Sequence, residues 1–423
     1  MKKLIVIAEE YNKIDHMLVD TLKNDMQDCR MYYLQDAPFL PKGHLSIYEY
    51  YLMRHEKMVP QEKDLYYVFI DVPEFWEIQA HGTNGAVIYQ GKKKAIIYFR
   101  HPIVARLVQR VEWQTEKGHV YKIDYYNRYG WVYCSAFTND AGMVISKSYY
   151  NSQREELIHV NLSNGVVSLF ENGKVTKLYH NVTEFEEAMI RELVSEADVV
   201  VNATVNSGER IVTVAKEIGA TLISCVPNIT GADKFLIMSN SSTARYMADS
   251  EKNEYKVPYS RANYPASRGG RDVFLLTASD SIFGLEQLVE RLPHMNFHIA
   301  ARTMMSTKLM NMKDMENVYL YPGIDEENIE KLLGQCDFYL DCNYLNEVEE
   351  IVSRAAYENL LILAYENWMH NRDYVLDENI YGQGAVEDMI QTLDTLSKNP
   401  EALEEMKIRQ QQKARLVIRT IME

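Results

Sequence analysis

The residues best suited to chemistry lie late in the chain, in the stretch NEVEEIVSRAAYENLLILA at 346–364. It carries four glutamates, and carboxylates accept hydrogen bonds from hydroxyl groups such as those of a sugar. Asn346 is placed to cap a helix that we expect over 347–358, ahead of a buried strand. The helix is predicted by apolar residues at helical spacing, which form one core-facing stripe: Val348, Ile351, Val352, Ala355 and Ala356.

This helix should start beside the carboxyl end of the preceding strand, FYLD at 338–341. In open α/β sheets this edge is where ligands bind, and helix N-termini attract anions. The sequence HNR at 370–372 follows the next strand and is expected at the same edge. The pattern therefore predicts a ligand-binding edge in the last third of the chain.

The elements that position this edge alternate regularly between strand and helix over 266–400, which predicts a doubly wound parallel sheet. Residues 1–72 and 181–265 alternate in the same way, and LYYVFI at 65–70 is expected there as a buried strand. Residues 401–423 are expected to form a closing helix that packs back toward the first domain. The fold class is α/β, with two Rossmann-like domains.

Residues 73–180 follow a different pattern. Gly118, Gly130 and Gly142 stand twelve residues apart, and runs rich in Tyr, Val, Trp and Ile lie between them. Turn sequences such as EKG and NDAG tolerate positive φ angles. This spacing predicts an antiparallel β-meander inserted into the first domain.

Composition excludes several classes of protein. The chain has 423 residues and a net charge of −15, so nucleic acid is not an expected partner. The five cysteines form no CxxC pair, which favours reduced thiols in a cytoplasmic protein and argues against a metal site. The start MKKLIVIAEE predicts a strand rather than a signal peptide, and no apolar run approaches the roughly 20 residues of a membrane span. Nothing in the sequence predicts a cofactor.

The unit at 346–364, within two α/β domains, resembles the GT-B glycosyltransferases. Retaining members carry a pattern like E-G-F-G-x-x-x-x-E-A-x-x-x-G-x-P-V-I-A here, in which the first Glu addresses the sugar and the second the ribose. Aligning the LLILA strand puts Asn346 and Arg354 at the two acidic positions. It also puts Glu347 and Glu349 at the glycines, where their charge would oppose a pyrophosphate.

The second donor signature of that family is also missing. Active members follow the first strand of the C-terminal domain with a basic residue and then Lys-Gly, which neutralise the diphosphate leaving group. Here this stretch contains Asp280 and Phe283. The resemblance therefore implies a GT-B-like fold without the groups that hold a donor.

A narrower resemblance covers most of the chain. In the meander it is carried by PEFWEIQAHGTNGAVIY, KKKAIIYF and RLVQRVEWQTEKGHVYKIDYYNRYGW, and later by FYLDCNYLNEVEEIVSRA and ENWMHNRDYV. These segments resemble the accessory Sec-system glycosylation chaperones. They are the glycosyltransferase-stabilising subunits of O-GlcNAc transferase complexes for serine-rich repeat adhesins.

This resemblance implies a non-catalytic subunit that pairs with a catalytic glycosyltransferase of the same fold. The complex would add the first GlcNAc from UDP-GlcNAc to Ser and Thr of the adhesin before accessory Sec export. The stabilising subunit would hold the acceptor polypeptide, at the cytoplasmic face of the membrane and peripheral to it. Side-chain amides and cations at the sheet edge suit such a backbone through hydrogen bonds. The expected acceptor contacts are Asn343, Asn346, Arg302, His370, Asn371 and Arg372.

Two surfaces are candidates for other contacts. Aromatic residues of the meander suit a partner interface, or else they pack on the sheet's own core: Trp113, Tyr125, Tyr126 and Trp131. The stretch 91–110 has six Lys and Arg and no acid, so it could touch anionic lipid or an acidic partner, or be an ordinary solvated hairpin.

Two other hypotheses remain open from the sequence. The chain could be an active retaining GT-B glycosyltransferase that uses a shifted donor site made of Glu350, Glu358 and Arg302. It could also be a scaffold whose cleft binds nothing.

Overall fold

The computed structural model describes residues 3–12, 15–23, 28–58, 60–204, 206–226, 229, 231–238, 254–261 and 263–422. Contacts within the chain divide it into two compact units. Unit 1 comprises Met1–Leu4, Lys13–Cys29 and Leu222–Glu423, and unit 2 comprises Ile5–Asn12 and Arg30–Thr221. The predicted division into domains at 72, 180, 265 and 400 stays a prediction. The sequence also predicts that the chain crosses between the two domains within 237–271, and residues 239–253 and 262 of that stretch lie outside the described residues.

One sheet has seven strands in the order β17-β16-β15-β14-β1-β2-β3. These strands are β1 (Lys3–Ala8), β2 (Asp28–Tyr33), β3 (His44–Ser46), β14 (Val199–Asn202), β15 (Thr221–Ser224), β16 (Lys234–Met238) and β17 (Glu254–Val257). The accompanying helices are α1 (Asp15–Lys23), α2 (Ile47–Arg54), α3 (Val182–Ser195) and α4 (Gly208–Ile218). Ser46 and Asn181 cap α2 and α3 through their side-chain oxygens, as the chemistry of N-caps favours.

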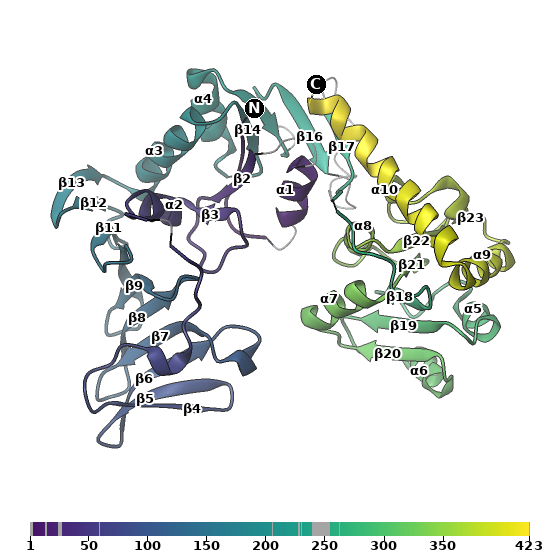
Figure 1. Ribbon diagram of the computed structural model, residues 1–423, viewed down its shortest axis with the longest axis horizontal. Coiled ribbons are helices and arrows are strands. Elements are labelled where there is room, and N and C mark those ends of the chain that lie inside the picture. Colours follow the sequence, from purple (N-terminus) through teal and green to yellow (C-terminus); the bar gives the residue numbers. More distant parts are fainter. Residues whose placement is uncertain are drawn as a thin grey trace. The chain divides into compact units, whose positions relative to one another are not determined.

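The predicted β-meander is confirmed as a ten-stranded sheet in the order β13 to β4, in which every strand pairs with its chain neighbour (Figure 1). The strands are β4 (Glu77–His81), β5 (Asn84–Tyr89), β6 (Lys92–Phe99), β7 (Val108–Gln114), β8 (Val120–Tyr126), β9 (Val132–Thr138), β10 (Val144–Tyr150), β11 (Glu156–Asn161), β12 (Val167–Glu171) and β13 (Lys174–Tyr179). Gly118, Gly130 and Gly142 turn the chain at φ angles of 81°, 86° and 77°, a conformation that favours glycine.

The prediction of a buried strand at 65–70 is wrong. Only Tyr66 makes a β-bridge, and Tyr67–Phe69 form a 3-10 turn, η1, that leaves Val68 and Phe69 exposed. A second 3-10 turn, η2 (Ile103–Ala105), lies in the connection between β6 and β7. The apolar run has the composition of a core strand, but among the described residues no element covers the side chains of Val68 and Phe69.

The last sheet is parallel and has the strand order β20-β19-β18-β21-β22-β23. Its strands are β18 (Asp272–Leu276), β19 (Asn296–Ala301), β20 (Val318–Pro322), β21 (Phe338–Asp341), β22 (Leu361–Tyr365) and β23 (Ile380–Tyr381). This is the doubly wound order whose direction reverses between the first and fourth strands, here β18 and β21. The prediction of a doubly wound parallel sheet is confirmed.

Helices cover both faces of this sheet (Figure 1). They are α5 (Leu285–Arg291), α6 (Thr307–Met310), α7 (Glu326–Gln335), α8 (Ile351–Tyr357), α9 (Val386–Lys398) and α10 (Pro400–Met422), with short 3-10 turns η4 (Asn311–Asp314), η5 (Arg372–Tyr374) and η6 (Asp377–Asn379). Leu288 of α5, Leu393 of α9 and Leu403 of α10 meet in one buried cluster with the strands. Pro400 opens α10, where its missing N–H costs no hydrogen bond.

A buried ion pair fastens α10 to the sheet. The Lys407 ammonium bonds to the Asp337 carboxylate at the start of β21, and both side chains are inaccessible to solvent. Burial alone would raise the pKa of Asp337, but Lys407 and the backbone N–H groups of Arg268 and Gly270 lower it. The Asp337 carboxylate thus has both hydrogen-bond donors and a counter-ion, and the counter-ion is supplied by α10.

Replacing Lys407 by an uncharged residue of similar size should destabilise unit 1. Lys407→Met leaves a buried carboxylate without its cation, which costs about 3–5 kcal/mol of folding free energy. Urea unfolding, with hydrogen exchange of the α10 amides, measures the loss. Lys398→Met is the matched control, because Lys398 makes an exposed pair with Asp394 on α9 and should change stability by less than about 1 kcal/mol. Equal effects of the two substitutions would contradict the assignment.

Glu49 on α2 should make unit 2 sensitive to pH. Its carboxyl is buried, with the Arg128 guanidinium 3.9 Å away, and burial raises its pKa to about 7 from 4.5. A raised acid pKa means that the folded chain binds this proton more tightly, so its contribution to stability is lost as pH rises from about 4.5 to 7.

Glu49→Gln imitates the protonated acid at every pH. The stability of the variant relative to the wild type should therefore improve by about 2 kcal/mol between pH 5 and pH 8. Urea unfolding at the two pH values measures this difference, in which the titration of other groups cancels. A constant difference across that range would contradict the prediction.

Candidate functional site at the carboxyl edge of the C-terminal sheet

The candidate site lies where the strand order of the last sheet reverses, at the carboxyl ends of β18, β19, β21 and β22. The loops that leave these strands meet there, and this is the general ligand-binding position of doubly wound sheets. Ile282 and Asn343, from the loops after β18 and β21, form a β-bridge that ties the two together. The whole edge belongs to unit 1.

The helix α8 starts later than predicted. It begins at Ile351, because Glu349 and Glu350 adopt left-handed backbone angles, with φ of 51° and 55°. The prediction that Asn346 caps the helix is therefore wrong. Instead, the Glu347 carboxylate accepts the N–H of Val352 at 2.8 Å. An anion from the chain itself occupies the helix start, where a ligand phosphate would otherwise be favoured.

An ionic network fills the rest of this edge. The Arg302 guanidinium donates to both carboxylate oxygens of Glu349, with Nε to Oε1 at 2.8 Å, and also to Glu326. Arg354 donates to Glu326 at 2.7 Å and to Glu330 at 2.5 Å, and only 9% of its side chain is exposed. Two cations thus face three carboxylates, and neither guanidinium is left to hold a phosphate.

The shifted pair of carboxylates keeps the spacing of the two acidic positions, since Glu350 precedes the first residue of α8 and Glu358 follows the last. Glu358, however, pairs with Arg261 at 2.9 Å. The hypothesis of an active enzyme with a shifted donor site is therefore not favoured.

His370 is fixed by contacts within the chain. Its Nδ1 bonds to the Asp341 carboxylate at the end of β21, its backbone N–H donates to the same carboxylate at 2.7 Å, and Nε2 donates to the Leu345 carbonyl at 2.6 Å. Burial lowers the pKa of His370, but these acceptors outweigh burial and raise it to about 9. The charged ring clamps the loop after β21 to the loop after β22, so its role here is structural. Sequence spacing gave no signal for the Asp341 partner.

The other residues predicted to contact the acceptor polypeptide differ in their exposure to solvent. Asn343 and Asn371 are buried, and their side chains accept backbone N–H groups of their own turns. Asn346 is exposed. Arg372 is exposed as well, with 59% of its side chain in solvent, and contacts Asp377 at 3.3 Å.

Sequence analysis missed an aromatic cluster at the same edge. Phe283 stacks on Trp368 with ring centroids 4.3 Å apart, and Tyr344 lies 5.0 Å from Trp368. Phe283 and Tyr344, with Lys308 and Glu286, line an open pocket of about 320 Å³. Three separate loops contribute these rings, so no single motif could have revealed the cluster.

The four aromatic residues predicted to bind a partner also differ in placement. Tyr126 is buried in the meander core, and half-buried Trp113 packs on that core and donates its indole N–H to Asp124 at 2.6 Å. Tyr125 and Trp131 are half-buried. Trp131 stacks on Tyr129 with centroids 5.1 Å apart.

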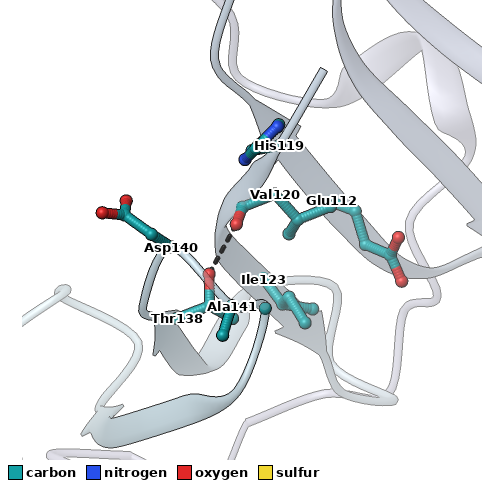
Figure 2. A pocket seen from close by; sticks show the side chains of 8 residues that line it. Glu112, His119, Val120, Ile123, Thr138, Asp140 and Ala141 are labelled. Carbon is teal, nitrogen blue, oxygen red and sulfur yellow. Dashed lines mark hydrogen bonds between the residues drawn. The ribbon is translucent and has the colours of Figure 1, made fainter. Parts of the chain in front are cut away.

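The meander also carries an open pocket of about 420 Å³ at the end of β7, β8 and β9 (Figure 2). His119 and Asp140 approach it from two neighbouring turns, and the Thr138 hydroxyl donates to the Val120 carbonyl at 2.5 Å at its base. Across the described part of the chain, no three His, Cys, Asp or Glu side chains gather into a metal site. Nor does any helix there have the length and apolarity to cross a membrane. All five cysteines are free, and four are buried.

Two family models match the middle and the C-terminal part of the chain. The model of the GtfB middle domain matches residues 76–180, and the model of the GftB/GlyA-F C-terminal domain matches residues 273–411. The UDP-N-acetylglucosamine–peptide N-acetylglucosaminyltransferase stabilizing protein GtfB of Streptococcus agalactiae is 30% identical over 86% of each chain. The protein of the same name from Streptococcus gordonii is 26% identical over 89% of this chain and 88% of its own.

Solved structures define the fold. A crystal structure of a GtfA/B complex bound to UDP and GlcNAc contains a chain with a TM-score of 0.60 and 24% identity, covering 97% of this chain and 96% of that one. The structure of TarM gives a TM-score of 0.54 at 12% identity, covering 98% and 95%. The fold is therefore GT-B with an antiparallel meander, as predicted. The chain belongs to the family of the peptide N-acetylglucosaminyltransferase stabilizing proteins, and it is not the transferase itself.

Proposed function

We propose that this chain is the non-catalytic, stabilising and acceptor-binding subunit of a protein O-GlcNAc transferase complex. The complex adds the first GlcNAc from UDP-GlcNAc to Ser and Thr of serine-rich repeat adhesins before accessory Sec export. The observation that carries this proposal is the ionic network at the sheet edge, in which Arg302 and Arg354 are neutralised by glutamates of the chain itself.

Electrostatics explains why such an edge does not support transfer. A transferase stabilises the charge on its leaving diphosphate with cations that are already in place, and each such contact is worth several kcal/mol at the transition state. Here Glu347 and Glu349 add negative charge where the diphosphate would lie, and Arg302 is committed to Glu349. Binding a nucleotide would require breaking these pairs inside a partly buried site.

The same edge retains features that suit a polypeptide. Arg372 and Asn346 are exposed donors, and the rings of Tyr344 and Trp368 provide an apolar surface beside them. A Ser/Thr-rich chain offers mainly carbonyl and hydroxyl acceptors, which amide and guanidinium groups bind without a metal or a cofactor. Buried Asn343 and Asn371, together with clamped His370 and Arg302, act in this proposal as supports of the loops that carry the exposed residues.

We place the complex in the cytoplasm, at the inner face of the membrane. The stretch 91–110 is a candidate for contact with anionic lipid or an acidic partner. Arg100 pairs with Asp64 at 3.0 Å and Arg110 with Glu112 at 2.9 Å, so these two of its six cations are already paired. Attachment to a membrane therefore has to rely on the remaining cations or on the partner.

The purified chain alone should neither bind UDP nor transfer GlcNAc. Calorimetric titration with UDP should be silent, because the cations of the edge are paired with carboxylates. Mixing the chain with a catalytic GtfA-type subunit should give transfer to a Ser/Thr-rich adhesin fragment that exceeds the activity of the catalytic subunit alone. Saturable UDP binding together with turnover by this chain alone would overturn the proposal.

Arg372→Ala should weaken the binding of a labelled Ser/Thr-rich peptide about tenfold, because it removes one charge-assisted hydrogen bond. Fluorescence anisotropy of the peptide against the intact chain measures this. Arg409→Ala is the matched control, since Arg409 on α10 is similarly exposed and pairs with Glu378 at 2.6 Å. Equal weakening by both variants would point to non-specific charge, and an absence of saturable binding would favour the pure scaffold hypothesis.

A further inference from the structure

A methionine-rich segment follows strand β19 of the C-terminal sheet. Residues 304–315 contain five of the 20 methionines of the chain, and the segment includes α6 and η4. Met305 and Met312 belong to the buried cluster of this sheet, and Met310 and Met315 pack against it. Met304 differs, because its side chain is 81% exposed. One thioether of the segment is therefore presented to solvent, while the others contribute to the core.

The residues on either side of Met304 hold this side chain outward. The carbonyl of Thr303, just before it, accepts the N–H of Gly323 at 3.0 Å, and Ser306, two residues after it, caps α6 through its side chain. Met305 is only 8% exposed, so turning Met304 inward would displace Met305 from the core. The exposure of Met304 is therefore set by the contacts of its neighbours.

Met304 lies at the carboxyl edge that carries the proposed acceptor contacts. It stands two residues after Arg302, which belongs to the ionic network through Glu349 at 2.8 Å. Tyr344 and Leu345, in the loop after β21 at the same edge, are also more than half exposed. A flexible, polarisable thioether adapts to partners of different shape, which suits a polypeptide that binds in many registers. Met304 is thus placed where a change in its polarity alters the surface that an acceptor meets.

Exposure also decides which thioethers react with a peroxide. The sulfur lone pair attacks one oxygen of hydrogen peroxide, the O–O bond breaks, and the sulfur keeps that oxygen as a sulfoxide. The sulfur loses two electrons, and the peroxide is reduced to water. Methionine sulfoxide is polar, and reductases return it to the thioether. Among the side chains that the structure describes, Met58 and Met143 are the other methionines more than half exposed, and both belong to unit 2.

We propose that Met304 is a reversible oxidation site that regulates acceptor binding at the carboxyl edge. In the thioether form Met304 gives the acceptor an apolar and adaptable contact. In the sulfoxide form that contact is lost, and binding weakens. The proposal rests on the proposed function for the identity of the ligand. It adds a regulated residue to an edge where Arg302 and His370 are fixed by ionic contacts within the chain.

The test treats the intact chain with millimolar hydrogen peroxide and follows each methionine by tandem mass spectrometry of tryptic peptides. Met304 should be oxidised at least about tenfold faster than its buried neighbours Met305 and Met312, which the peroxide cannot reach. Binding of the labelled Ser/Thr-rich peptide, measured by fluorescence anisotropy, should then weaken about fivefold. Treatment with methionine sulfoxide reductases should restore the affinity.

Two variants assign the effect to one residue. Met304→Leu keeps an apolar side chain without sulfur, so its affinity should be the same before and after peroxide. Met143→Leu is the matched control, because it removes an exposed methionine of unit 2, and it should lose affinity on oxidation as the wild type does. Oxidation of Met304 no faster than that of Met305, no loss of affinity after Met304 is oxidised, or an equal loss in Met304→Leu overturns the switch alone. If the untreated wild type does not bind the peptide, the proposed acceptor role and the switch are overturned together.

Discussion

A guanidinium that is withdrawn from water needs a carboxylate nearby, and this requirement organises the carboxyl edge of the C-terminal sheet. Arg354 is almost fully covered, and its neighbours Glu326 and Glu330 on α7 satisfy it. Arg302 then binds the remaining face of Glu326 together with Glu349. Three elements that a ligand would otherwise hold together, namely α7, the approach to α8 and the loop after β19, are joined by charges of the protein itself.

This ionic network also explains the backbone conformation of the loops around it. Glu349 can reach Arg302 because two consecutive residues take left-handed backbone angles, and this delays α8 until Ile351. Glu347 then satisfies the helix start, and the charged ring of His370 holds the same loop to Asp341. Contacts within the chain thus hold the edge together. Such an edge suits a subunit that presents a preformed surface to other proteins rather than one that closes around a substrate.

Structural features that depend on residues close together in the chain were predictable from the sequence. The glycines at 118, 130 and 142 correctly predicted turns. The alternation of strand and helix after residue 266 correctly predicted the doubly wound sheet. Asn346 and Arg354 at acidic positions indicated the loss of donor groups. The network itself was not predictable, because Arg302 and Glu349 are 47 positions apart and their pairing depends on the left-handed turn. LYYVFI misled the prediction, since its composition resembles a buried strand and only the fold shows which side chains stay uncovered.

The carboxylate of Glu326 is shared by Arg302 and Arg354, and this sharing limits which single substitutions the edge tolerates. Both arginines depend on it, so the five charged residues are energetically coupled and a change at one alters what the others tolerate. Restoring an acid at position 354 alone would set it beside Glu326 and Glu330, and restoring glycine at 349 alone would deprive Arg302 of a counter-ion. Either substitution alone is therefore expected to give a less stable protein, so the donor pattern is not recovered one residue at a time without a loss of stability.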